Sequence, residues 1–183
     1  MFKQQVSTSV TMRFYNILPL FFLVTTAIAD GAAIVNAIDE VANTTTSLNT
    51  TVSNWDGSIL SSFPIITLST KLLIDINSGT HIAKASANLS LIETITIAGA
   101  TSSLVTTVQS TLQTITRAKP KFDHLLFSPL ILLNLVEEKS ATDKFSAAII
   151  QKVPVDYQAL AEQIVAPVDT AFGQAILVYE GLA

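Results

Sequence analysis

The stretch AAIVNAIDEVANTTTSLNTTVSNW, residues 32–55, carries one stripe of positions spaced alternately four and three residues apart. The stripe consists of Ile34, Ile38, Val41, Thr45, Leu48, Val52 and Trp55. This spacing lines one side of an α-helix, because a helix completes a turn every 3.6 residues. Asp56-Gly57 then interrupts the pattern. The stretch therefore predicts an amphipathic helix that packs in a bundle.

Four further helices are predicted from similar spacings and from helix-breaking residues. They cover residues 58–76, 89–117, 128–153 and 154–181. Asn77-Ser78-Gly79 is expected to end the second helix, and Pro120 to end the third, because proline disfavours helix at the residue before it. The third segment is rich in Thr and Ile, which favour strand, but its period favours helix. We predict an all-α fold, a single-domain bundle of about five helices with an apolar interior or cavity.

An apolar run near the N-terminus predicts a secretory leader. Ile17–Val24 is apolar, follows a basic residue and precedes Ala27 and Ala29, which supply the small-x-small cleavage pattern. The run is too short to span a membrane, which needs about 20 apolar residues. We expect a signal peptide at residues 1–29. Its start is either the first methionine or Met12, and the sequence leaves both open.

Residues 30–183 then form one mature domain, expected to be secreted or held in the cell wall without a transmembrane anchor. The chain has 10 Lys and Arg against 14 Asp and Glu, so no basic face for a nucleic acid is expected. It has no cysteine, so the apolar core alone must stabilise the domain.

No pattern of catalytic or metal-binding residues is evident. His81 and His124 lack neighbours at metal-ligand spacing, and no Gly-x-Ser-x-Gly turn accompanies Asp123-His124. Glu137-Glu138-Lys139 is interpreted as the solvated side of a helix. We therefore expect no enzymatic activity, no metal and no cofactor.

Three sequons predict N-linked glycans in a secreted chain. They are Asn43-Thr-Thr, Asn49-Thr-Thr and Asn88-Leu-Ser. Asn43 and Asn49 lie off the apolar stripe of the first helix, as glycosylation requires.

Several motifs give the chain a family resemblance. They are Lys119-Pro-Lys-Phe-Asp123, Lys152-Val-Pro154 and Val168-Asp-Thr-Ala-Phe172-Gly-Gln-Ala-Ile176-Leu-Val-Tyr179, preceded by Ile38-Asp39, Leu48-x-x-x-Val52 and Asp56-Gly57. With these motifs the chain resembles the fungal hydrophobic surface-binding protein A family, which is related to the lipid-binding domains of cell-wall galactomannoproteins.

The resemblance implies a non-enzymatic fungal protein, secreted or wall-associated, that holds a fatty acid or similar lipid between its helices. It also implies an alternative, adsorption to hydrophobic surfaces and recruitment of a secreted hydrolase. The chain departs from many relatives in being richer in Thr and Ile and in lacking a long Ser/Thr-rich tail.

The residues expected to line a binding site come from the helical stripes alone. They are Phe63, Ile66, Leu73, Ile95, Gly99, Ser102, Leu112, Phe145, Ile149, Leu160, Ile164, Phe172 and Ile176, with Ala98 beside them. Where large residues meet small ones, a core is either tightly packed or leaves a void. We expect leucine at Gly99 or Ser102 to fill such a void.

Overall fold

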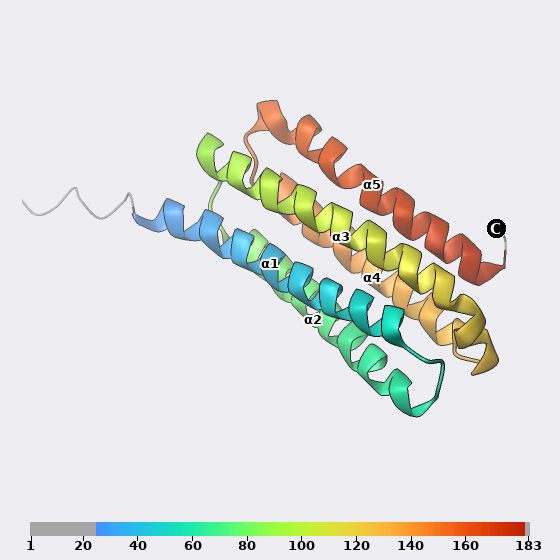
Figure 1. The fold of residues 1–183 in the computed structure, drawn as a ribbon. Helices are drawn as coiled ribbons and strands as arrows, with labels where there is room; N and C mark the ends of the chain where they lie inside the picture. Colours follow the sequence, from blue (N-terminus) through green and yellow to red (C-terminus); the bar gives the residue numbers. More distant parts are fainter. Residues whose placement is uncertain (1–24, 182–183) are drawn as a thin grey trace, which may run out of the picture.

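The computed structural model describes residues 25–181, and they form five α-helices (Figure 1). The helices are α1 (Thr25–Asn54), α2 (Phe63–Ala85), α3 (Leu91–His124), α4 (Ser128–Ile150) and α5 (Val155–Glu180), with a 3₁₀ turn at Leu60–Ser62 before α2. No strand occurs between residues 25 and 181, so the predicted all-α bundle is confirmed.

Most of the predicted leader lies outside the described residues. The position expected to become the first mature residue, Asp30, lies in α1. Its Oδ2 accepts a hydrogen bond of 3.2 Å from the backbone N–H of Ala87, in the connection between α2 and α3.

The five helices close into a ring. α1 packs against α2 and α3, α5 packs against α3 and α4, and α2 packs against α4. Successive helices run in opposite directions along one long axis (Figure 1). Each helix therefore has two flanking neighbours and one side that faces the middle of the ring.

Local sequence signals set several helix ends. Ser90 caps α3, and its hydroxyl and the Glu93 side chain form a reciprocal capping box. Proline occupies the first turn of both α2 and α4, where its missing N–H costs nothing. Gly181, with φ of 76°, ends α5 in the left-handed conformation that glycine adopts easily.

Most threonine hydroxyls of α3 donate to the backbone carbonyl four residues earlier, so they are paired within the helix. Thr96 Oγ1, for example, donates to the Ile92 carbonyl at 3.1 Å. The helix also includes Thr94, Thr107 and Thr111. Burial of one side of α3 against α1 and α5 then outweighs the strand propensity of Thr and Ile.

The predicted end of the second helix at residues 77–79 is wrong. α2 continues to Ala85, and Gly79 lies inside it. A Cβ at Gly79 would lie 2.8 Å from Cζ of Phe145 on α4. The glycine therefore lets α2 and α4 approach closely around the Phe145 ring. Burial of Ile76 and Ala83, on either side of Gly79, stabilises the helix beyond the predicted end.

The predicted end of the third helix at Pro120 is also wrong, because α3 continues to His124. Phe122, in the turn after the proline, is 1% exposed, and its ring centroid lies 4.5 Å from that of Trp55. Burial of this aromatic ring holds the last turn in place, although Pro120 removes one backbone donor.

Candidate functional site

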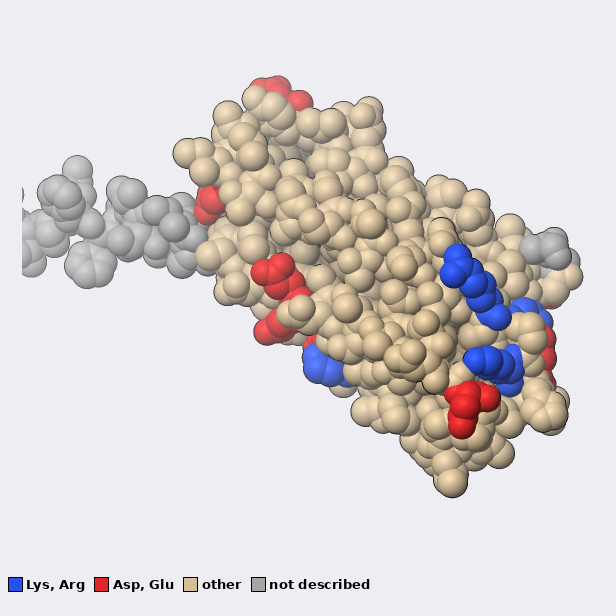
Figure 2. Space-filling view, in the orientation of Figure 1, with Lys and Arg blue, Asp and Glu red and all other residues tan. Residues whose placement is uncertain are grey.

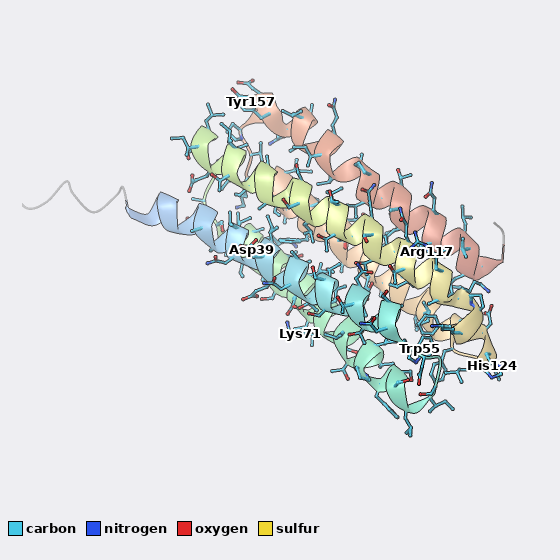
Figure 3. The ribbon with its side chains drawn as sticks, in the orientation of Figure 1. Asp39, Trp55, Lys71, Arg117, His124 and Tyr157 are labelled. Carbon is cyan, nitrogen blue, oxygen red and sulfur yellow. The ribbon has the colours of Figure 1, made fainter. Side chains whose placement is uncertain are left out.

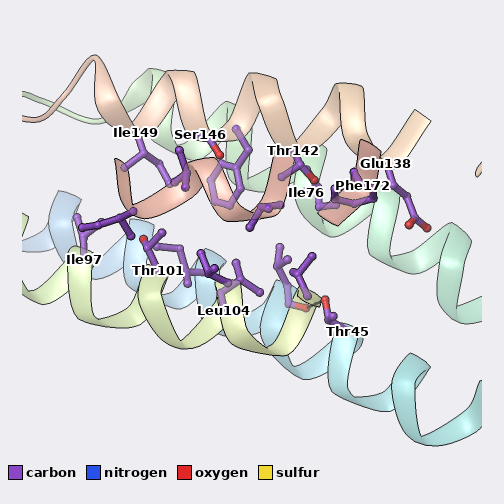
Figure 4. A pocket seen from close by; sticks show the side chains of 18 of the residues that line it. Thr45, Ile76, Ile97, Thr101, Leu104, Glu138, Thr142, Ser146, Ile149 and Phe172 are labelled. Carbon is purple, nitrogen blue, oxygen red and sulfur yellow. Dashed lines mark hydrogen bonds between the residues drawn. The ribbon is translucent and has the colours of Figure 1, made fainter. Parts of the chain in front are cut away.

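An internal cavity lies in the middle of the ring, with a volume of about 90 Å³ (Figure 4). All five helices contribute to its wall. Its lining includes Ile38 and Leu48 of α1, Leu72 and Ile76 of α2, Ile97, Ala98, Thr101, Leu104, Val105, Val108, Leu112 and Ile115 of α3, Phe145, Ile149 and Ile150 of α4, and Ile164, Val165, Val168 and Phe172 of α5. A water molecule needs about 10–15 Å³ of such space, so the cavity accommodates roughly six to nine groups of that size.

The wall of the cavity offers an apolar surface. Several threonines line it, and the hydroxyls of Thr45, Thr94 and Thr111 donate to backbone carbonyls one turn earlier in the chain. Thr45 Oγ1 donates to the Val41 carbonyl at 2.7 Å, and Thr94 Oγ1 donates to the Ser90 carbonyl at 2.9 Å. An apolar cavity of this kind favours an apolar occupant over water.

One ionisable side chain, Glu138 of α4, interrupts this wall. It is 4% exposed, and its Oε1 accepts a hydrogen bond of 2.7 Å from Ser69 Oγ of α2. Burial raises the pKa of the Glu138 carboxyl to about 7, opposed by the Ser69 hydrogen bond and assisted by the charge of Glu137. Thr142, one turn further along α4, also lines the cavity.

The sequence interpretation of Glu138 as part of a solvated helix face is wrong. The spacing of the sequence does indicate that Glu138 is buried, because this residue fills the gap between Leu135 and Thr142 in the apolar stripe of α4. The stripe reads Ile131, Leu135, Glu138, Thr142, Phe145 and Ile149. Acidic residues are rarely buried, so the charge of Glu138 favours a solvated position although its place in the helical period favours the interior.

Five of the residues expected to line a site lie together in the cavity wall. They are Leu112, Phe145, Ile149, Ile164 and Phe172. Three others lie outside it with large exposed fractions: Phe63 at 58%, Ile95 at 64% and Leu160 at 56%. Ile66, Leu73 and Ile176 are half-buried and do not line the cavity.

The expected placement of Gly99 and Ser102 in the interior is wrong. Both are exposed, and a Cβ at Gly99 would meet nothing within 4 Å. Ala98, which was expected beside them, does line the cavity, and so does Thr101. The first half of α3 is apolar on several sides, so the stripe drawn through Leu91 and Ile95 lies about one residue away from the side that is buried.

The remaining polar candidates lie on the surface. His81 and His124 are exposed, and His124 lies at one end of the bundle, near the end of α1 that carries Trp55 (Figure 3). Within residues 25–181, no cluster of His, Asp and Glu is suited to hold a metal ion.

The three sequons differ in their surroundings. Asn43 and Asn88 are exposed. Asn49 is half-buried, and its Nδ2 donates to Ser110 Oγ of α3 at 3.3 Å. A glycan at Asn49 would therefore have to displace a contact between α1 and α3.

Charged side chains are sparse on the surface, and a broad uncharged area covers α3 and α5 in the view of Figure 2. Large apolar side chains are exposed where these two helices begin: Leu91, Ile92 and Ile95 of α3, and Val155, Tyr157 and Leu160 of α5. α3 also contains an 18-residue window with a mean hydropathy of 1.3, long and apolar enough to cross a membrane by composition, of which 17% is buried in the bundle.

Comparisons with known proteins agree with this architecture. Cell wall mannoprotein 1 of Aspergillus fumigatus is 25% identical over 158 residues, which are 86% of this chain and 55% of that protein, so the chain spans about half of its relative. A crystal structure of Afmp4p in complex with palmitic acid superimposes with a TM-score of 0.79 at 23% identity, covering 81% of this chain and 99% of that chain.

A second solved structure is ligand binding domain 1 of the Penicillium marneffei MP1 protein complexed with arachidonic acids. It superimposes with a TM-score of 0.78 at 17% identity, covering 82% of this chain and 98% of that chain. These likenesses show the shared fold. The family model described as hydrophobic surface binding protein A matches residues 31–151, most of the helical ring. The chain belongs to the hydrophobic surface binding protein A family.

Proposed function

We propose that this protein is a non-enzymatic lipid-binding protein that takes up a fatty acid or similar acyl chain between its helices. The observation that carries the proposal is the closed ring of five helices around an apolar cavity. Two structural neighbours that share the fold were solved with palmitic and arachidonic acids, which supports the same class of ligand here.

The size of the cavity sets a condition on this function. A methylene group is about as large as a water molecule, so about 90 Å³ accommodates roughly half of a 16-carbon chain. A long-chain acid therefore either widens the ring as it enters or leaves part of its chain outside the cavity. α5 is a suitable element to move, because large apolar side chains in its first turns are exposed.

The proposal is tested by identifying what the purified protein carries and whether it is stabilised. Organic extraction followed by mass spectrometry should yield a bound lipid. A long-chain fatty acid at about a hundred times its dissociation constant should stabilise the folded protein by about 2.7 kcal/mol. In a domain of this size that corresponds to a rise in melting temperature of roughly 5–10 °C.

A pair of variants on α3 separates cavity binding from nonspecific stabilisation. Ala98→Leu adds bulk to the cavity wall and should reduce the rise in melting temperature. Ser102→Leu adds the same bulk one turn away on the exposed side and should leave the rise intact. An unliganded protein whose melting temperature is unchanged by fatty acids of every length would refute the proposal.

A second candidate function, adsorption to hydrophobic surfaces, is supported by the exposed apolar side chains at the start of α3 and α5. Recruitment of a secreted hydrolase would then be a consequence of adsorption. Substituting Ile92, Ile95 and Val155 with serine should weaken adsorption to a hydrophobic bead and leave fatty-acid binding in solution unchanged.

We propose that the leader is removed after Ala29 and that the mature protein is extracellular or wall-associated, as the wall mannoprotein relative suggests. Sequencing the N-terminus of the secreted protein should give Asp30 first. Retention of the full-length chain in a membrane would contradict this.

A further inference from the structure

We propose that Glu138 holds the polar end of the bound lipid, so that the cavity takes acyl chains whose polar end brings an O–H donor. Such ligands are fatty alcohols, and fatty acids that share one proton with the glutamate. This inference rests on the proposed lipid-binding function and names the polar contact within the same site.

The position of Glu138 relative to the cavity carries the inference. Its side chain lines one end of the main cavity, while Ile97 and Ile149 lie toward the other end (Figure 4). Glu138 also lines a second, smaller cavity of about 20 Å³, together with Ser69 and Asn134. That volume suits one small polar group, and Glu138 therefore connects a space for a chain with a space for a polar end.

Glu138 also retains hydrogen-bonding capacity. One carboxyl oxygen accepts from Ser69 Oγ at 2.7 Å, and a carboxyl group offers a second oxygen for a further partner. A buried carboxyl surrounded by apolar side chains is costly unless it is paired or protonated. A ligand that donates an O–H, or accepts one from the protonated acid, supplies such a partner.

The surroundings of Glu138 contain no other charge that would counter its own. Among the described residues that line the two cavities, Glu138 is the one ionisable side chain. The facing residues are Leu48 and Val52 of α1, Ile65, Ser69 and Leu72 of α2, Ile115 and Phe122 of α3, and Val168 and Phe172 of α5.

The lysines close to Ser69 and Glu138 in the sequence pair with other carboxylates. Lys71 Nζ of α2 pairs with Asp75 Oδ2 at 2.6 Å, and Lys139 of α4 pairs with Asp143 and Asp169. Glu137, next to Glu138 on α4, is exposed and adds negative charge.

This arrangement makes the binding of a carboxylic acid depend on pH. An aliphatic acid is ionised in water above about pH 5. When Glu138 is protonated, it donates its proton to the ligand carboxylate, and the two carboxyl groups share it. When Glu138 is also ionised, two carboxylates would meet in an apolar site, which disfavours binding. Since the Glu138 pKa is about 7, affinity for the acid should fall as the pH rises above neutral.

Octanoate and 1-octanol are suitable probes, because their chains match the cavity as it stands. For the full-length mature protein, calorimetry should show the dissociation constant for octanoate rising roughly a hundredfold between pH 6 and pH 9. That for 1-octanol should change less than about threefold, because a hydroxyl can donate to the ionised form. Glu138→Gln should bind octanoate with the same affinity at both pH values. The matched control, Glu137→Gln, should still lose affinity for octanoate between pH 6 and pH 9.

The possible outcomes separate the two proposals. If the wild-type protein binds neither probe nor any longer acid, the lipid-binding function itself fails, and this inference fails with it. If octanoate binds but with equal affinity at pH 6 and pH 9, or if Glu138→Gln retains the fall, lipid binding stands and the role of Glu138 is refuted. Circular dichroism of each variant at both pH values establishes that the fold is unchanged.

Discussion

Replacement of Glu138 by glutamine should change how the stability of the protein depends on pH. The carboxyl is buried in the wall of the cavity, and its pKa is about 7 in the folded protein against an ordinary value of 4.5. Between these two pH values the folded chain binds more protons than the unfolded chain. The free energy of unfolding should therefore fall as the pH rises from about 4.5 to 7.

The size of this effect follows from the difference between the two pKa values. Each pH unit of that difference corresponds to 1.36 kcal/mol, so ionisation of Glu138 should cost the wild-type protein about 3 kcal/mol by pH 8. The glutamine variant has the same shape and cannot ionise. Its stability relative to the wild type should rise by about that amount between pH 4 and pH 8.

Urea denaturation monitored by circular dichroism at intervals from pH 4 to pH 8 measures this difference. Taking the difference between the two proteins removes the contributions of the other carboxyls. Glu137→Gln is the control, because it removes an exposed charge from the same turn. That charge is the smallest contribution to the raised Glu138 pKa, so this variant should keep most of the wild-type fall in stability. Parallel curves for wild type and Glu138→Gln would refute the burial argument.

Three further predictions follow from the packing of the helices and from the sequons. Gly79→Ala places a methyl group 2.8 Å from the Phe145 ring and should destabilise the protein by about 1–3 kcal/mol. Gly99→Ala places its methyl group where no atom lies within 4 Å, and it should stabilise the protein by up to about 1 kcal/mol. Thermal melts that rank the two variants the other way would contradict the close approach of α2 and α4. Tyr179→Phe removes the hydrogen bond of 2.8 Å from Oη to the buried Ile115 carbonyl and should cost about 1–2 kcal/mol in urea denaturation, and an unchanged midpoint would show that this bond contributes nothing. Secreted material should lose mass on enzymatic deglycosylation, and an unchanged mass would mean that all three sequons are unused.

The sequence predicted the number and type of elements because each of these rests on local information. The alternation of four and three in residues 32–55 fits a helix and no strand, and the prolines in the first turn of α4 and just before α5 mark real helix starts. The family resemblance was likewise carried by short helix-packing motifs, and the match to residues 31–151 confirms it.

Helix ends were predicted less well where packing outweighs local preference. Gly79 and Pro120 are helix breakers by their backbone chemistry, and both lie inside helices. In each case a buried aromatic ring, Phe145 or Phe122, supplies the packing energy that keeps the helix going. Only the partner helix, distant in sequence, provides that energy.

The lining of the site was predicted only in part, because of the way the helices form a ring. The sequence by itself determined that five amphipathic helices exist and that their stripes form an apolar interior, because period and composition are properties of each segment alone. Each helix in the ring has two flanking neighbours and one side toward the cavity, so its apolar arc is wide, and period cannot say which part of that arc faces inward. Only the tertiary structure decided that Ala98 lines the cavity while Gly99 and Ser102 are exposed, and that Glu138 is buried there. Neighbouring residues point about 100° apart around a helix, and the packing of all the adjacent helices together decides which of them faces the cavity.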